Sequence, residues 1–237
     1  MSGQKALFWD FDGTLAWSKS LWTGSVHGAL RLVEPDTAVT IEDVRPLMQA
    51  GYTWHTPEKD YLHLREPALW WENMRRHFTG IYSQLGVSSH TAGEAAGLVR
   101  ELILRPENYY VYEDAAPTLD ACRQAGFRCY ILSNNYPELP AIIESIGLSR
   151  FFCGYTISAL VGYEKPRREI FASAMAMAGN PDVRYMIGDI PVADIGGARA
   201  AGIPAILVHG SDECSADFTC AELRQIPGAI GISAPLL

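Results

Sequence analysis

The chain has 237 residues, long enough for more than one structural unit, and its 48% hydrophobic and 19% charged residues are ordinary for a globular protein with a sizeable core. Disordered and fibrous classes are excluded by this composition. The formal net charge of -8 at pH 7, without an obvious cluster of Lys and Arg, argues against nucleic acid as a partner.

The first predicted element is a buried strand over Ala6 to Phe11, which is short, apolar and aromatic. It runs into Asp10-Phe11-Asp12-Gly13-Thr14, and ligands bind at the carboxyl ends of strands in open α/β sheets. Asp10 and Asp12 would share a face if the strand continued, while Gly13 allows the backbone to bend. Turns also favour Asp and Gly, so the rest of the chain must decide between a plain turn and a phosphoryl-transfer site.

A long insertion follows, roughly Ala16 to Glu107, and its pattern is helical. Thr40 to Asp43 resembles a capping box, Pro67 lies near the start of a helix that Gly86 ends, and Thr91 to Glu94 gives another capping box. We therefore expect several amphipathic helices without strands in this segment.

Aromatic and titratable side chains of the insertion are candidates for substrate contact, although such stripes are more often core. Trp17 has the best claim because it lies just after the first motif. The other candidates are Trp22, Trp54, His55, His63, Trp70 and Trp71.

From Asp114 onward, strand and helix patterns alternate, as in a parallel sheet. The apolar run Cys129 to Leu132 ends at Ser133 and Asn134, where a hydroxyl and backbone amides could hold a phosphate oxygen. Lys165 stands at the start of the next helical pattern, where the helix dipole disfavours a cation.

The last informative strand is Arg184 to Ile187, which leads into Gly188-Asp189. Asp194 follows five residues later. Carboxylates thus stand again at a predicted strand end.

These four segments resemble, in order and spacing, the four motifs of the haloacid dehalogenase superfamily of hydrolases. Trp70-Trp71-Glu72 and the close spacing of the last two motifs look most like the phosphoglycolate phosphatase-like, helical-cap branch of this superfamily. The resemblance implies an α/β fold with a three-layer Rossmann-like parallel-sheet core formed by residues 1–15 and 108–237. Residues 16–107 would be an α-helical cap inserted after the first strand. Ile190 and Ala193 depart from the serine and asparagine often found there, and leave the carboxylates intact.

The resemblance also implies a Mg²⁺-dependent phosphatase that acts on a small phosphorylated metabolite. Asp10 would be the nucleophile and a metal ligand, and Asp12 the general acid and base, with its backbone carbonyl on the metal. Neighbouring carboxylates raise the pKa of Asp12 while the metal and Lys165 lower it, and the sequence leaves that balance open. Asp189 would be the further metal ligand.

The remaining site residues follow from the same resemblance. Ser133, the amide of Asn134 and Lys165 would bind the phosphoryl oxygens. Thr14 and Asp194 would support the metal or the lysine from nearby.

Asp12 separates the alternatives. Relatives that break carbon–halogen bonds generally lack this second aspartate, and phosphonate-cleaving relatives usually carry a small residue in its place. Sugar-phosphate mutases share the Asp-x-Asp pattern and stay open as an alternative. A non-catalytic binding or regulatory protein also stays open, although no catalytic carboxylate is lost; a dinucleotide-binding oxidoreductase would need a G-x-G-x-x-G after the first strand.

Neither a signal-peptide pattern nor an apolar stretch long enough for a membrane span occurs, so we expect a cytoplasmic protein without a membrane partner. Five cysteines form neither C-x-x-C nor a zinc spacing and are interpreted as reduced thiols. Whether the chain is a monomer or a homodimer stays open.

Overall fold

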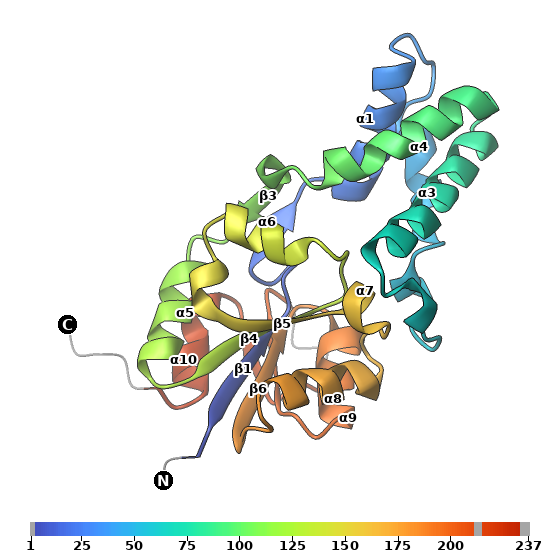
Figure 1. Ribbon diagram of the computed structural model, residues 1–237. Coiled ribbons are helices and arrows are strands. Elements are labelled where there is room, and N and C mark those ends of the chain that lie inside the picture. The colour runs from blue at the N-terminus through green and yellow to red at the C-terminus, as the bar shows by residue number, and fades with distance from the viewer. Residues whose placement is uncertain (1–2, 211–214, 233–237) are drawn as a thin grey trace.

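The computed structural model describes residues 3–210 and 215–232 of the chain. A sheet with flanking helices forms one part, and the helices that follow the first strand gather beyond one end of this sheet (Figure 1). Cys214, one of the five cysteines, lies outside the described residues.

The central sheet is parallel throughout, with strand order β5-β4-β1-β6-β7-β8. The first strand is central, with Trp9 opposite Ile131 of one neighbour and Ile187 of the other. Burial on both faces explains why this strand is continuously apolar. The six strands are β1 Lys5–Trp9, β4 Arg128–Ser133, β5 Phe152–Ile157, β6 Val183–Gly188, β7 Ala205–Val208 and β8 Phe218–Cys220.

Alternate side chains of β1 enter two different hydrophobic clusters, which makes the core three layers thick. Leu7 and Trp9 pack in the cluster that contains apolar residues of α5, α6 and α10. Ala6 and Phe8 pack in the cluster that contains those of α8 and α9. The helices of this part are α5 Ala115–Gln124, α6 Leu139–Ser145, α7 Ser158–Val161, α8 Arg168–Met177, α9 Gly197–Ala200 and α10 Ile226–Ala229.

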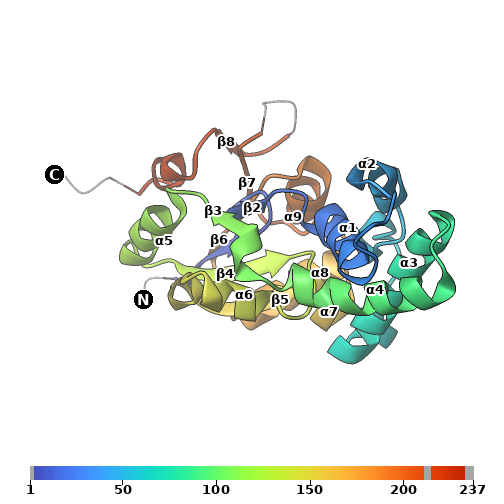
Figure 2. The same cartoon turned by 90° about the horizontal axis from the view of Figure 1, so that it is seen from above.

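The helical group between β1 and β3 is built on α1, which packs against α4, and on α3, which packs on the other side of α4 (Figure 2). Apolar side chains recur on the inner faces of these helices, for example Val26, Phe78 and Val99. The four helices are α1 Leu21–Val33, α2 Ile41–Val44, α3 Pro67–Gln84 and α4 Ser89–Ile103. We call this group the cap.

A small antiparallel sheet stands where the chain leaves and re-enters the core, and it corrects the expectation of an insertion without strands. β2 Ala16–Ser18 pairs with β3 Tyr109–Val111. Pattern reading missed both because three residues are too short for a periodic signal. The predicted boundaries at 15/16 and 107/108 fall beside these two strands and stay a proposal as the limits of the cap.

Local helix signals were read correctly at two of the three starts. Thr40 caps α2 in a complete capping box with Asp43, and Pro67 opens α3. The capping box predicted at Thr91 is wrong: Ser88 is the N-cap residue of α4, and its side chain accepts a hydrogen bond from the Thr91 amide. Two overlapping polar starts compete there, and the earlier one gains an additional turn of helix.

The connecting segments contain single turns of 3-10 helix and one π-helical turn, η6, after β6. No helix in the described ranges combines the length and the apolar character needed to cross a membrane. The short turns are η1 Arg45–Gln49, η2 Thr53–His55, η3 Leu62–Leu64, η4 Pro106–Asn108, η5 Ser149–Phe151, η6 Pro191–Gly196 and η7 Leu223–Gln225.

Candidate active site

The predicted polar residues come together at one edge of the sheet. Strands β4, β1 and β6 are neighbours, and their carboxyl ends open into a cavity of about 620 Å³ between the sheet and the cap. The predicted residues that line this cavity are Asp10, Asp12, Ser133, Asn134, Lys165 and Asp189. Thr14 and Asp194, expected to support the site, are fully buried next to it.

Lys165 is buried between two carboxylates. Its ammonium nitrogen lies 2.8 Å from Asp10 Oδ1 and 2.6 Å from Asp194 Oδ1. Burial opposes the charge of Lys165, but Asp10 and Asp194 outweigh it and raise the pKa of the lysine. The other oxygen of Asp194 accepts a hydrogen bond from the Ile190 amide at 3.0 Å, so Asp194 is tied to the lysine on one side and to the backbone on the other.

One expectation about Lys165 is corrected. The helix that follows Lys165, α8, begins at Arg168 with Arg167 as its N-cap residue, so the lysine precedes the helix and is not part of its first turn. The two carboxylates, and not the helix dipole, therefore dominate its electrostatic environment.

Asn134 fastens the lysine loop to the end of β4. Its side-chain oxygen accepts a hydrogen bond from the Lys165 amide at 2.6 Å, and its side-chain nitrogen donates to the Lys165 carbonyl at 3.0 Å. The side chain of Asn134 thus positions the lysine, a role that the sequence pattern did not suggest. Ser133, directly before it, is buried at the cavity wall.

Asp12 is held by a residue that sequence reasoning left without a role. The Asn135 side-chain nitrogen donates to Asp12 Oδ2 at 2.7 Å, and the same side chain accepts from the Tyr136 amide at 3.0 Å. Burial, and next the charge of Asp10, raise the pKa of Asp12 to about 7 despite this hydrogen bond. Burial and the neighbouring carboxylates therefore outweigh the lowering effect of Lys165 on this pKa. In the sequence, only the position of Asn135 directly after Ser133-Asn134 could have indicated its contact with Asp12.

The carboxylates also fit a metal ion. One oxygen each of Asp10, Asp189 and Asp194 lie within 4.8 Å of one another. Asp194 is already engaged by Lys165 and the Ile190 amide, so Asp10 and Asp189 have the carboxylate oxygens that could bind a metal ion. Several carboxylates around one ammonium leave negative charge in excess, and an oxygen-only set suits Mg²⁺.

The neighbours of Asp189 fix the orientation of its carboxylate. Thr14 Oγ1 donates to Asp189 Oδ1 at 3.0 Å. Gly13 has a φ of +80°, and a Cβ at this position would lie 2.3 Å from Asp189 Oδ2. Burial, followed by the charge of Asp10, raises the pKa of Asp189 to about 6, the response expected of a carboxylate held beside another one.

The cap supplies the apolar wall of the cavity. Of the cap candidates, Trp17, Trp22 and Trp54 line it. His55 and His63 are exposed and stand outside the lining of this cavity.

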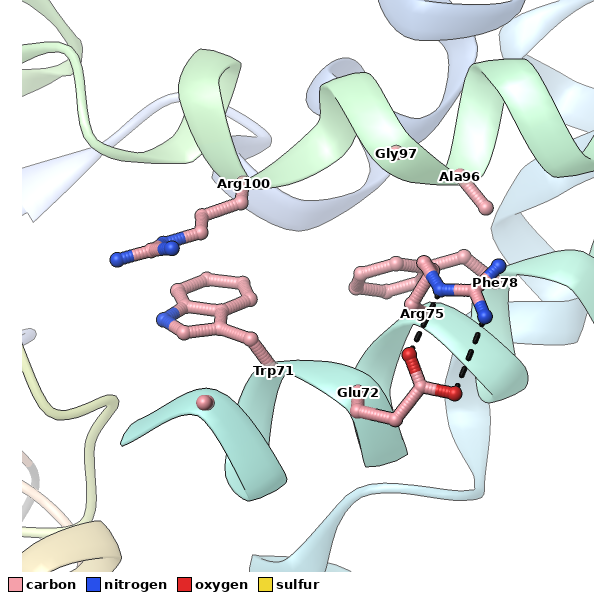
Figure 3. A pocket seen from close by; sticks show the side chains of 8 residues that line it. Trp71, Glu72, Arg75, Phe78, Ala96, Gly97 and Arg100 are labelled. Carbon is pink, nitrogen blue, oxygen red and sulfur yellow. Dashed lines mark hydrogen bonds and ion pairs between the residues drawn. The ribbon is translucent and has the colours of Figure 1, made fainter. Parts of the chain in front are cut away.

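Trp70 and Trp71 also lie outside the lining of the cavity. Trp70 is buried in the cap core, and Trp71 lies in a separate hollow between α3 and α4, where its ring faces the guanidinium of Arg100 (Figure 3). Aromatic spacing alone could not separate these core positions from the three that reach the cavity.

The comparisons with known proteins agree with this geometry. A family model for haloacid dehalogenase-like hydrolases matches residues 4–202. The chain therefore belongs to the haloacid dehalogenase-like hydrolase family. This match includes all four motifs and the cap.

Two curated relatives carry the names of phosphatases. A phosphoserine phosphatase of Thermus thermophilus is 32% identical over 143 residues, which cover 57% of this chain and 57% of that protein. A glyceraldehyde 3-phosphate phosphatase of Methanopyrus kandleri is 26% identical over 210 residues, covering 86% of this chain and 84% of the relative. The chain spans a little over half the length of the first of these relatives.

Solved structures share the fold. A 2-haloacid dehalogenase from Pseudomonas syringae pv. Tomato is 21% identical with a TM-score of 0.69, covering 96% of this chain and 98% of that one. A predicted phosphoglycolate phosphatase from Haemophilus somnus is 16% identical with a TM-score of 0.65, at the same coverage of 96% and 98%. At these identities the likeness extends to the three-layer core and the helical cap, and function must be argued from the site.

Proposed function

We propose that this chain is a Mg²⁺-dependent phosphatase that hydrolyses a small phosphate monoester through an aspartyl-phosphate on Asp10. The observation that carries the proposal is the convergence in one cavity of Asp10 and Asp12, which follow β1, with Lys165, which lies in the loop between α7 and α8. A phosphatase needs a nucleophile, a proton donor and a cation for the phosphoryl oxygens, and these three side chains supply them.

In the first step, a carboxylate oxygen of Asp10 attacks phosphorus and the ester P–O bond breaks. Asp12 gives its proton to the leaving alkoxide, and its pKa of about 7 means that a protonated fraction exists near neutral pH. Lys165 and Ser133 hold the phosphoryl oxygens while charge builds on them.

In the second step, water attacks the phosphorus of the aspartyl-phosphate and gives a proton to Asp12. The P–O bond to Asp10 breaks, inorganic phosphate leaves, and both aspartates return to their starting forms. Asn135 keeps Asp12 in the same orientation for both steps because its side-chain nitrogen donates a hydrogen bond to Asp12 Oδ2.

Asp10, Asp189 and the backbone carbonyl of Asp12 would hold Mg²⁺, which when bound neutralises phosphoryl charge and shields the nucleophile from the phosphate. Thr14 keeps Asp189 turned toward that site. Asp194 serves the lysine instead, through the 2.6 Å ion pair.

A sugar-phosphate mutase is the second candidate, since it would use the same two aspartates. Its bisphosphorylated activator needs a second cationic site, and Lys165 is the sole Lys, Arg or His among the described residues that line the cavity. The lining therefore favours hydrolysis. A non-catalytic protein on the same fold would not need the intact set of carboxylates.

Phosphate release from a panel of small esters, with Mg²⁺ and with EDTA, tests the proposal. We expect release with Mg²⁺, loss of release with EDTA, and no release by Asp10→Asn. If the purified protein with Mg²⁺ hydrolyses none of the esters, including p-nitrophenyl phosphate, the phosphatase proposal is wrong. Stoichiometric transfer of phosphate to a second hydroxyl without release would favour the mutase.

The cellular setting is part of the proposal. A small phosphorylated metabolite is the expected partner, as the names of the two curated relatives support. The four cysteines within the described residues are unpaired, which suits the reducing cytoplasm.

A further inference from the structure

The part of the cavity that would receive the leaving group is aromatic and uncharged. Trp17, Trp22 and Trp54 come from the cap, and Ile190 and Val192, from the core segment after β6, line the same cavity. Trp17, Ile190 and Val192 are at least 44% exposed, so this wall is open to an incoming molecule. Ligand pockets of roughly 300–1,000 Å³ hold organic molecules of moderate size, and the volume of about 620 Å³ exceeds what a phosphate alone needs.

Contacts with other aromatic rings hold the three tryptophans in place. Trp54 stacks on Tyr52 with ring centroids 4.5 Å apart, and Trp22 lies 5.3 Å from Trp54. Trp17 stacks on Tyr110 at 4.6 Å. Rings ordered in this way lose little conformational freedom when a flat ligand binds against them.

Charge argues against an acidic leaving group. Lys165 is the one cationic side chain among the described lining residues, and both Asp10 and Asp194 already engage it. A carboxylate or second phosphate on the substrate would lie among the carboxylates of the site without a cation of its own. Enclosing an unpaired charge is costly, whereas an uncharged ring would gain contact area.

Resting on the proposed phosphatase function, we propose that the substrate is a phosphate monoester of an uncharged aromatic alcohol, whose ring packs against Trp22 and Trp54. The wall thus selects against substrates that carry a carboxylate on the leaving group. Trp54 is the main specificity residue because its ring is both stacked and turned toward the cavity.

Three alkyl esters with similar leaving groups test this without a difference in intrinsic reactivity: ethyl phosphate, 2-phenylethyl phosphate and 2-(4-carboxyphenyl)ethyl phosphate. We expect kcat/KM for the phenylethyl ester to exceed the values for the other two by about tenfold or more. In Trp54→Ala the ratio of phenylethyl to ethyl ester should fall by most of this factor. Leu32→Ala, an exposed position on the outer face of α1, should retain the ratio.

A gain-of-function variant covers the case in which Trp54→Ala does not fold. Val192 is 70% exposed at the rim, so Val192→Arg should fold and should raise kcat/KM for the carboxylated ester relative to the phenylethyl ester. Equal use of ethyl and phenylethyl phosphate, or preference for the carboxylated ester by the unmodified protein, would overturn the substrate class but leave the phosphatase standing. Failure to hydrolyse any of the three esters, together with p-nitrophenyl phosphate, would instead overturn the phosphatase and the substrate class with it.

Discussion

Gly13 occupies a position at which both the backbone and a side chain matter. Its φ of +80° belongs to the left-handed region, and an added Cβ would collide with Asp189 Oδ2 at 2.3 Å. Gly86 provides a matched control, because its φ is +76° but nothing lies within 4 Å of an added Cβ. Both glycines thus have a left-handed backbone conformation that disfavours a side chain, and only at Gly13 would the side chain also collide with a neighbouring residue.

We expect Gly13→Ala and Gly86→Ala each to lose about 1–2 kcal/mol of unfolding free energy from the backbone alone. Gly13→Ala should in addition displace Asp189 and raise the Mg²⁺ concentration for half-maximal phosphate release by roughly ten- to a hundredfold. Titration of phosphate release with Mg²⁺ in both variants measures this. A similar Mg²⁺ requirement in the two would contradict the placement of Asp189 at the metal.

Glu164 gives a pH prediction for stability. It is buried next to Lys165, and its Oε1 accepts a hydrogen bond from Thr53 Oγ1 of the cap at 2.5 Å. Burial raises the pKa of Glu164 to about 6, against the lowering effect of Thr53, Ser158 and Lys165. A raised pKa in the folded state favours the protonated form, so the stabilisation is fully present below the unfolded pKa and is lost as the pH rises through about 6.

The free energy of unfolding of the unmodified protein, relative to Glu164→Gln, should therefore fall by about 2 kcal/mol between pH 4.5 and 7. Gln retains an acceptor for Thr53, so the comparison isolates the proton. Denaturant unfolding across this pH range measures the difference, and Glu113→Gln, at an exposed position, corrects for the lost charge. A constant difference would show that folding does not raise the pKa of Glu164, and a rising difference would show that folding lowers it.

At the scale of elements, α6 joins the cap to the core through one carboxylate. Glu138, the N-cap residue of α6 in the core, accepts a hydrogen bond from Trp71 Nε1 of α3 at 2.8 Å. Its other oxygen pairs with Arg100 of α4 at 2.5 Å, and the guanidinium of Arg100 lies 5.5 Å from the centre of the Trp71 ring (Figure 3). One core side chain thus binds α3 and α4 of the cap.

We predict that Glu138→Ala favours a more open cap by about 1–2 kcal/mol, the sum of one hydrogen bond and one partly exposed ion pair. The fraction of closed molecules would then fall, and KM should rise more than kcat changes. Hydrogen exchange at α3 and α6, with and without Mg²⁺ and phosphate, follows the opening directly. As a control, Glu101→Ala removes an exposed ion pair with Arg105 within the cap and should leave KM and hydrogen exchange unchanged. If Glu138→Ala also leaves both unchanged, the Glu138 contacts do not hold the cap against the core.

How far the sequence predicts these features depends on the range of the interactions involved. Asp10, Ser133 and Asp189 could be placed together because parallel strands end at the same edge of a sheet, so three apolar runs suffice. Thr40 could be read as a helix cap because its partner Asp43 lies three residues away. Both kinds of inference need only local pattern and topology.

Contacts that depend on tertiary packing could not be predicted in this way. Thr53 and Glu164 are 111 residues apart, and neither belongs to a pattern that names the other. Trp71 and Trp54 look alike in the sequence, yet one binds Glu138 and the other lines the cavity, because the orientation of each helix in the cap decides. The three-residue pairing of β2 with β3 is set by the return of the chain, which a local window does not contain.

At the scale of the whole molecule, the cap and the core contribute different parts of the proposed activity. In the proposed reaction the core supplies the nucleophile, the proton donor and the cation, while the cap adds the aromatic side chains that line the same cavity. Such a division lets the same chemistry serve different esters, because a change in the cap leaves the carboxylates in place.

The central claim is that Asp10 becomes phosphorylated during turnover. The most direct measurement is mass spectrometry of peptides from protein quenched in acid during steady turnover of p-nitrophenyl phosphate, in the Asp12→Asn background that slows hydrolysis of the intermediate. The account predicts one phosphoryl group on the peptide that contains Asp10, and none when Asp10→Asn is added. Continued phosphate release with an unmodified Asp10 peptide, or a label that persists in Asp10→Asn, would contradict it.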